Sequence, residues 1–190
     1  RRRFAQGSHE YLIEQVQYNN YDLSDGDNSV TLDLNYPVKE LIWVMRHPTR
    51  GTSNIESKVN ENNNSVNTND WFNYSSDNIN TNLGYNTYDP FSTMKLIFNG
   101  LDRFSKRDAL YFRQVQPIQY HSAVPSKQVY LYSFSLKPEQ HQPTGTCNFS
   151  RLDTTKLIFS GVAKSELLLF ATNYNILRIS GGMGGLAYTT

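Results

Sequence analysis

The sequence is short of cysteine, of long apolar runs and of net charge, and each shortage excludes a class of protein. Cys147 is the only cysteine in 190 residues, so an intrachain disulfide framework and a cysteine-rich zinc site are both excluded. The longest apolar runs are five residues, Leu41–Met45 and Leu167–Ala171, whereas a membrane-spanning helix needs about 20. A formal net charge of +1 predicts no direct binding to nucleic acid through bulk charge.

Motifs for metal binding and hydrolysis are missing as well. The histidines show neither H-x-H nor H-x-x-x-H spacing, and they are scattered at His9, His47, His121 and His141. No G-x-S-x-G nucleophile elbow occurs. Cys147 with His141 or His121 as a base is an alternative, but a small side chain at the start of a strand is favoured, because no motif places an orienting acid. We therefore predict no enzyme, with no catalytic, cofactor or metal residues.

A glycine-rich tail, Gly181–Ala187, contains the G-x-G-x-x-A skeleton of a dinucleotide-binding loop. That loop must open a helix within a βαβ unit, and only three residues of this sequence follow Ala187. We therefore interpret the glycines as a tight turn between two strands and expect no cofactor.

One segment, residues 47–90, holds most of the polar excess. It contains 12 asparagines in 44 residues and carries a net charge of −3. Asparagine side chains bond their own backbone and favour turns over ladders, and a loop of this length within a domain is uncommon. We predict a single domain over residues 1–190 that is interrupted by a polar loop insertion at 47–90.

Most of the remaining chain has the composition and alternation of β-strands. Val30, Leu32 and Leu34 alternate with polar residues, which is the period of a half-buried strand. Further strands are predicted at 11–18, 39–46, 94–98, 129–135, 155–159, 167–179 and 184–189. A capping-box-like start at Ser105–Asp108 predicts one short helix. The pattern favours an all-β antiparallel sandwich or barrel with at most a short helix.

Three N-x-S/T sequons mark candidate N-glycosylation sites, at Asn63, Asn73 and Asn148. Two of them lie in the polar insertion, where we expect access to be high. Such matches also arise by chance in an asparagine-rich loop.

Several stretches occur in an order that resembles one known family. They are LDRFS (101–105), RDALYF (107–112), QVQPIQ (114–119), YLYSFSLKP (130–138), EQHQPTGTCNFSRLD (139–153) and ATNYNILRISGGMGGLAY (171–188), with LIEQVQ (12–17) and PVKELIW (37–43) upstream. The sequence resembles the major capsid proteins of nucleocytoplasmic large DNA viruses. The resemblance covers most of the chain, and the insertion is the divergent part.

This resemblance implies an eight-stranded antiparallel jelly-roll sandwich, the second of two such domains in a tandem capsid protein. Only one of the two is present, so the chain is expected to be a C-terminal fragment or a split version. The implied function is a structural subunit that assembles through homotrimeric capsomers into an icosahedral outer shell. Implied partners are its own copies, neighbouring capsomers and minor capsid or cement proteins, with an inner membrane beneath the shell touched only indirectly. The implied location is the virion, after assembly in the cytoplasm of an infected host cell.

For the assembly contacts we select the segment 103–112, in which charged and aromatic residues are mixed. The candidates are Arg103, Arg107, Tyr111 and Phe112. Packing of this segment on its own domain explains the same composition equally well. The alternative function is a carbohydrate-binding, lectin-like jelly roll, in which aromatic residues of the insertion stack on sugars.

Overall fold

Alternating apolar and polar residues build two antiparallel sheets in this computed structural model, which describes residues 5–48, 58–59, 65–66, 71–76 and 89–189. The first sheet has the order β1 (His9–Leu23), β12 (Ser165–Ser180), β3 (Pro37–Arg46) and β10 (Cys147–Asn148), with β9 (Tyr130–Ser133) also paired to β3 and β13 (Met183–Leu186) to β12. The second has the order β2 (Gly26–Thr31), β11 (Thr155–Val162), β6 (Thr93–Phe98) and β7 (Leu101–Asp102), with β8 (Arg107–Asp108) also paired to β6.

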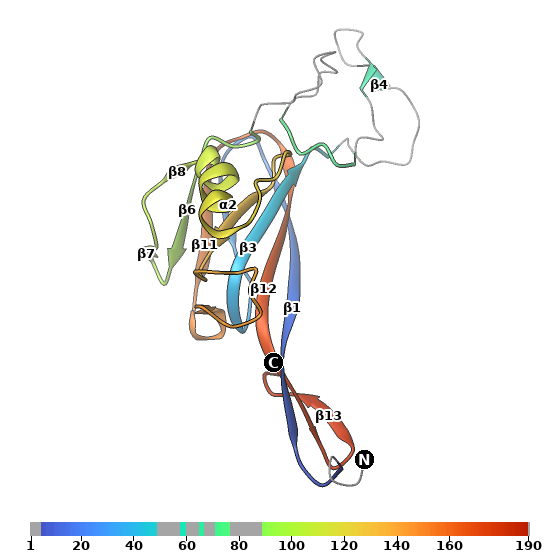
Figure 1. Cartoon of the computed structure of the whole chain (residues 1–190). Coiled ribbons are helices and arrows are strands. Elements are labelled where there is room, and N and C mark those ends of the chain that lie inside the picture. Colours follow the sequence, from blue (N-terminus) through green and yellow to red (C-terminus); the bar gives the residue numbers. More distant parts are fainter. Residues whose placement is uncertain (1–4, 49–57, 60–64, 67–70, 77–88, 190) are drawn as a thin grey trace.

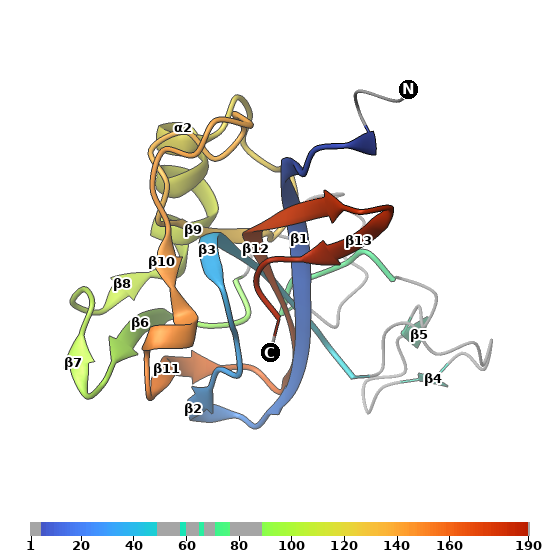
Figure 2. The ribbon, with the colours of Figure 1, turned by 90° about the horizontal axis from the view of Figure 1, so that it is seen from below.

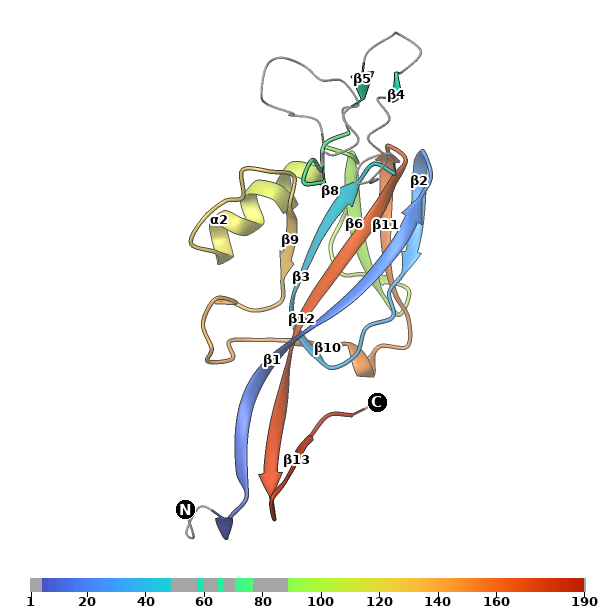
Figure 3. The same ribbon diagram turned by 90° about the vertical axis from the view of Figure 1, so that its right-hand side faces the viewer.

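Smaller elements connect or flank these sheets. They are the ribbon of β4 (Lys58–Val59) and β5 (Ser65–Val66), the π-helical turn η1 (Tyr111–Val115), the helix α2 (Gln116–Tyr120) and the 3₁₀ turn η2 (Phe149–Arg151). Figure 1 shows α2 beside the sheets, and Figure 3 shows it next to β9. Within the described part of the chain, no helix is both long and apolar enough to cross a membrane.

The chain crosses repeatedly between the two sheets, and this winding defines the topology. Strands β1, β3, β9 and β12 belong to the first sheet, and β2, β6, β8 and β11 belong to the second. Because the inner faces of both sheets are apolar, they pack on each other as a sandwich. The predicted all-β antiparallel sandwich is confirmed. The two packed sheets are called the body below.

Aromatic rings fill the centre of the body. Trp43 on β3 is fully buried, and its ring lies 5.4 Å from Phe112 and 5.9 Å from Tyr130. The row continues from Tyr130 through Phe91 to Phe159 on β11, at 4.8 and 5.2 Å between ring centroids. Stacked, tilted and edge-on pairs at these distances add to the stabilisation that comes from burial alone.

The bounds of strands β1, β2 and β12 differ from the prediction. β2 ends at Thr31, whereas the prediction continued to Leu34. Leu32 and Leu34 remain buried beyond the strand end, so apolar alternation alone placed the boundary too late. β1 and β12 are longer than predicted, because polar residues are tolerated along their faces.

The predicted short helix is confirmed, but its helical turns begin at Ala109 and not within the predicted cap at Ser105–Asp108. Arg107 and Asp108 pair with β6 as β8, and the amide of Ala109 donates to the carbonyl of Ser92 at 3.0 Å. Helical turns begin only after this bond, and η1 has no side-chain cap. Pairing with a neighbouring strand therefore overrides the local capping signal.

The predicted turn between the last two strands is confirmed. β12 and β13 are antiparallel, and Ser180 pairs with Met183. The two loop residues, Gly181 and Gly182, have φ angles of 58° and 84°. Positive φ at both central positions is the requirement of a type I′ hairpin, which glycine meets without steric cost.

A three-stranded extension, called the arm below, projects from the body (Figures 1 and 3). It consists of residues 9–14 of β1, residues 174–180 of β12 and all of β13. β1 and β12 pair from His9–Ile179 to Leu23–Ser165, whereas β3 pairs with β12 only as far as Asn173. The arm therefore extends beyond the N-terminal end of β3, and Figure 2 shows it from below.

A belt of buried amides separates the arm from the body. Asn173 and Asn175 have no exposed surface. The Nε2 of Gln17 donates to the Oδ1 of Asn173 at 3.1 Å and to the carbonyl of Asn35 at 2.6 Å. Asn175 holds the backbone of Tyr188, donating to its carbonyl at 3.0 Å and accepting from its amide at 3.1 Å. Because buried polar groups must be paired, this belt fixes where the apolar core ends.

Candidate assembly surfaces

The segment selected from the sequence lies on the side of the body, and its anchor points into the core. Phe112 is fully buried, with rings of Trp43, Phe104 and Tyr111 within 5.8 Å. A side chain with no exposed surface cannot contact a neighbouring subunit. Phe112 is therefore a core residue that positions the segment.

The other three candidates have exposed surface. Arg103 and Arg107 are exposed, and Tyr111 is half-buried. The guanidinium of Arg107 lies 5.5 Å from the ring of Tyr111. A cation over an aromatic face is a weak attraction at an exposed site, but it holds the arginine and the tyrosine together as one surface feature.

The helical turns that follow expose apolar residues that the sequence reasoning did not select. Leu110 is 48% exposed, Val115 39% and Ile118 68%. The opposite side of the same turns is anchored: the buried Gln116 accepts from the amide of Ser133 at 3.0 Å and donates to the hydroxyl of Tyr111 at 2.8 Å. The signal that could have identified them is the recurrence of apolar residues at positions 110, 115 and 118 in a segment that forms helical turns. We call Leu110, Val115 and Ile118, together with Arg103, Arg107 and Tyr111, the helix surface.

Charged and polar contacts fasten the loops after α2 to β3. His121 lies between two carboxylates, with Nε2 2.9 Å from Glu40 and Nδ1 3.2 Å from Glu139. The buried Lys39 binds Glu14 at 2.8 Å and the carbonyl of Pro138 at 2.8 Å. These contacts hold residues 121–139 in place beside the helix surface.

Glu139 is the carboxylate that this arrangement perturbs. The backbone amide and hydroxyl of Ser122 each donate to its Oε1 at 3.0 Å. These hydrogen bonds, with the neighbouring His121, lower the pKa of Glu139 below its ordinary value. The ionised carboxylate of Glu139 is therefore the form that binds Ser122 and His121.

Cys147 lies at the start of β10, as predicted, and is half-buried against the core. Burial raises the pKa of its thiol, which lowers the reactivity of a cysteine. Within the described residues, no group of three or more histidine, cysteine, aspartate or glutamate side chains is placed to hold a metal ion.

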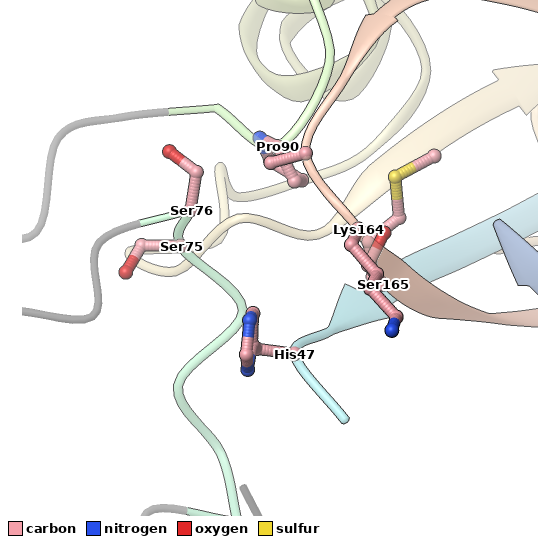
Figure 4. A pocket seen from close by; sticks show the side chains of 8 residues that line it. His47, Ser75, Ser76, Pro90, Lys164 and Ser165 are labelled. Atoms are coloured by element: carbon pink, nitrogen blue, oxygen red, sulfur yellow. The ribbon is translucent and has the colours of Figure 1, made fainter. Parts of the chain in front are cut away.

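The returning end of the insertion packs tightly against the body. Ser75 and Ser76 line a shallow hollow with His47, which follows β3, with Lys164, which precedes β12, and with Ser165, the first residue of β12 (Figure 4). No room for a water-sized ligand remains between them. This contact fixes the base of the insertion and does not form a ligand site.

Two aromatic residues of the insertion, Trp71 and Phe72, are 43% and 67% exposed. Each ring has a cation near one face, Arg46 at 5.4 Å from Trp71 and Lys127 at 5.6 Å from Phe72. Lys127 also donates to the carbonyl of Phe72 at 3.1 Å. These contacts fasten residues 71–72 to the body.

The sequons occupy different environments. Asn148 is exposed at the end of β10, and its Oδ1 accepts from the amide of Ser150 at 3.1 Å. Asn73 is half-buried and accepts from the amide and the hydroxyl of Ser75, and Ser75 is only 2% exposed. Asn63 lies outside the described residues. Glycosylation at all three stays a prediction.

Two antiparallel sheets that pack face to face, joined by a chain that crosses between them, define a protein of the jelly-roll class. Comparison with known proteins gives the family: residues 1–185 match the major capsid proteins of large eukaryotic DNA viruses. The chain belongs to this family. Family and fold together indicate a structural role that is not enzymatic.

Individual relatives and solved structures agree with this assignment. The chain is 38% identical to the major capsid protein of Pyramimonas orientalis virus, over 100% of this chain and 45% of the relative. It is 34% identical to the major capsid protein of Paramecium bursaria Chlorella virus 1, over 99% of this chain and 50% of the relative. The PBCV-1 virus capsid structure matches with a TM-score of 0.78 at 30% identity, over 100% of this chain and 54% of that chain. The Faustovirus major capsid protein shares the fold, with a TM-score of 0.70 at 16% identity over 90% of this chain and 34% of that chain.

The matches to full-length relatives cover only part of each relative. The chain spans about half the length of the curated relatives named above. The likeness to the PBCV-1 capsid confirms the predicted jelly-roll fold.

Proposed function

We propose that this chain is one jelly-roll domain of a capsid subunit, the second of two in tandem, and that the subunit forms homotrimeric capsomers. The capsomers tile an icosahedral outer shell, with minor capsid or cement proteins as further partners. Assembly takes place in the cytoplasm of the infected host cell. Family membership and the half-length match to relatives support this proposal.

The observation that carries the proposal is the helix surface. It combines arginine and tyrosine with exposed aliphatic residues, which is the composition of the centre of a protein interface. Phe112 and Gln116 anchor the segment from beneath, so the surface is rigid before a partner arrives. A preorganised surface loses less conformational entropy on association than a flexible one.

The experiment places a charge in the helix surface of the full-length protein. Ile118→Asp is expected to abolish trimers in mass photometry, because an unpaired carboxylate would be buried at the contact. Leu136→Asp is the matched control, since Leu136 is 72% exposed and lies outside the helix surface. Equal thermal unfolding of both variants establishes that each is folded. If the Ile118→Asp variant still forms trimers, the helix surface is not the contact that holds the trimer together.

A further inference from the structure

The ring of His121 lies between two carboxylates, one at each ring nitrogen. Its Nε2 is 2.9 Å from the Oε2 of Glu40 on β3, and its Nδ1 is 3.2 Å from the Oε1 of Glu139. A neutral imidazole has one nitrogen that donates and one that accepts, whereas both nitrogens of the imidazolium donate. Only the doubly protonated ring therefore donates to both carboxylates at once.

The two carboxylates differ in how much they depend on this ring. The side chain of Glu40 is 8% exposed, whereas that of Glu139 is 46% exposed. A buried carboxylate must stay paired, because an unpaired charge away from water is costly. When the ring of His121 loses one proton, the remaining proton therefore stays on Nε2, beside Glu40. Nδ1 then presents a lone pair to Glu139, and that contact becomes repulsive.

The other charged groups of this region are already paired. Lys39 on β3 binds Glu14 on β1 at 2.8 Å and the carbonyl of Pro138 at 2.8 Å. Tyr174 on β12 faces the same cluster, with the Nζ of Lys39 5.6 Å from its ring. Burial, with Glu14 and Glu40 nearby, raises the pKa of the Tyr174 hydroxyl, which therefore keeps its proton. Neither Lys39 nor Tyr174 replaces the positive charge of His121.

Glu139 joins two exposed segments of the chain. Its Oε1 accepts from the amide and the hydroxyl of Ser122, which follows His121, and the resulting lowered pKa keeps Glu139 ionised where histidines titrate. The next residue, Gln140, donates its amide to the carbonyl of Lys137 at 3.2 Å. The contact between His121 and Glu139 therefore ties the turn at 137–140 to the corner after α2.

Fixed points on either side limit what this contact controls. Pro138 is held by Lys39, and the hydroxyl of Thr144 accepts from the amide of Lys137 at 2.9 Å. His121 is also the C-cap of α2, and its amide donates to the carbonyl of Pro117 at 2.8 Å. Because Nε2 stays bound to Glu40 in both states of the ring, α2 keeps its position. Only residues 139–143 and the corner at Ser122 respond.

We propose that His121 is a pH-sensitive latch, which holds residues 139–143 to the end of α2 while both ring nitrogens are protonated. Loss of the Nδ1 proton as the pH rises turns an attractive contact with Glu139 into a repulsive one and loosens this segment. The latch goes beyond the assembly function and does not rest on it, because every contact in it lies within one chain.

The test is hydrogen exchange of the full-length protein, resolved to single amides by mass spectrometry. Protection is followed from about pH 5 to about pH 9, which spans the range in which histidine ordinarily changes charge, and is corrected for the intrinsic exchange rate. We expect the amides of Ser122 and Gln140 to lose protection several-fold as the pH rises through this range. The amides of β11 in the same samples are the reference for the fold and should keep their protection.

Two variants separate the latch from other causes of pH dependence. Glu139→Gln should abolish the transition, because an amide accepts from the imidazolium and donates to the neutral ring, so the contact fits both states. His141→Gln is the matched control, since His141 is exposed in the same segment, and it should leave the transition unchanged.

Four outcomes overturn the latch. Protection of Ser122 and Gln140 that is constant across the range would show that His121 controls nothing there. A transition that survives Glu139→Gln would exclude the proposed partner, and one that disappears in His141→Gln would belong to His141. A transition shared by β11 would be unfolding of the body and not the release of one segment.

Discussion

The body and the arm share two strands but differ in what covers them. β1 and β12 run through both regions with continuous pairing, and both regions are rich in leucine, isoleucine and tyrosine. In the body a second sheet covers their inner face, whereas the residues of the buried core cluster all lie outside the arm. The difference shows that the sequence of a strand is enough to specify its pairing with the neighbouring strand. The stability of the paired strands depends on the layer that packs against their apolar face.

The belt of amides is what divides the two regions. Asn173 and Asn175 occupy inward positions of the kind that leucine and alanine occupy earlier in β12. Their hydrogen bonds close the core at this end and hold the C-terminal segment at Tyr188. The buried amides therefore mark the point on β12 where the apolar core ends.

Truncation in the body should have the largest effect. Leu169→Ala removes a fully buried side chain from β12 and leaves a cavity between the sheets. We expect the free energy of unfolding to fall by about 2–5 kcal/mol, measured by urea denaturation. A loss well below this range would show that the two sheets do not form a tight core.

Disruption of the amide belt should have an intermediate effect. Asn175→Ala leaves the amide and carbonyl of Tyr188 and the Oε1 of Gln15 without their partner. We expect a loss of about 1–3 kcal/mol and faster hydrogen exchange in residues 183–189. Asn20→Ala, at an exposed position on β1, is the control and should change neither quantity appreciably.

Truncation in the arm should have a small effect on the isolated chain. Leu177→Ala repeats the Leu169→Ala change on the same strand and the same face, eight residues further along. Because Leu177 is only half-buried and lies outside the buried core cluster, we expect a loss of about 1 kcal/mol or less. Equal losses for the two variants would contradict the contrast between body and arm.

The smallest effect should come from the ion pair at the insertion end of β3. The guanidinium of Arg46 lies 2.6 Å from Glu166 and lowers the pKa of that carboxyl below its ordinary value of 4.5. A carboxylate with a lowered pKa in the folded state stabilises the fold above its unfolded pKa, and this stabilisation is lost as the pH falls through the folded value.

Glu166→Gln should therefore cost about 0.5–1 kcal/mol at neutral pH and nothing once the wild-type carboxyl is protonated. Thermal unfolding across the acid range measures this difference. A difference between Glu166→Gln and wild type that does not shrink in acid would show that the charge of Glu166 does not carry the contact.

Sequence patterns predicted the body well, because burial follows alternation there. The regions around Val30, Trp43 and Leu157 were identified as strands from their β-rich composition or period-2 pattern alone. The length of β1 was missed, because residues 19–23 contain two asparagines and an aspartate that pair normally in the ladder. The helix start was misplaced, because the contact between Ala109 and Ser92 joins residues 17 apart, and no local signal encodes such a contact.

The candidate surface was predicted only in part, for the same physical reason. Arg103, Arg107 and Tyr111 were identified from composition, but composition does not show which aromatic side chain points inward. Phe112 was selected with them and lies in the core, whereas Ile118, two-thirds exposed, was not selected. The direction of each side chain depends on how η1 and α2 pack, which is a tertiary property.

The central claim is that this jelly roll belongs to a subunit that assembles with its own copies. Mass photometry of the purified full-length protein, with electron microscopy of the same sample, tests it most directly. The account predicts particles of three copies that form ordered arrays at higher concentration. Single copies at every concentration, with no trimers or arrays, would contradict it.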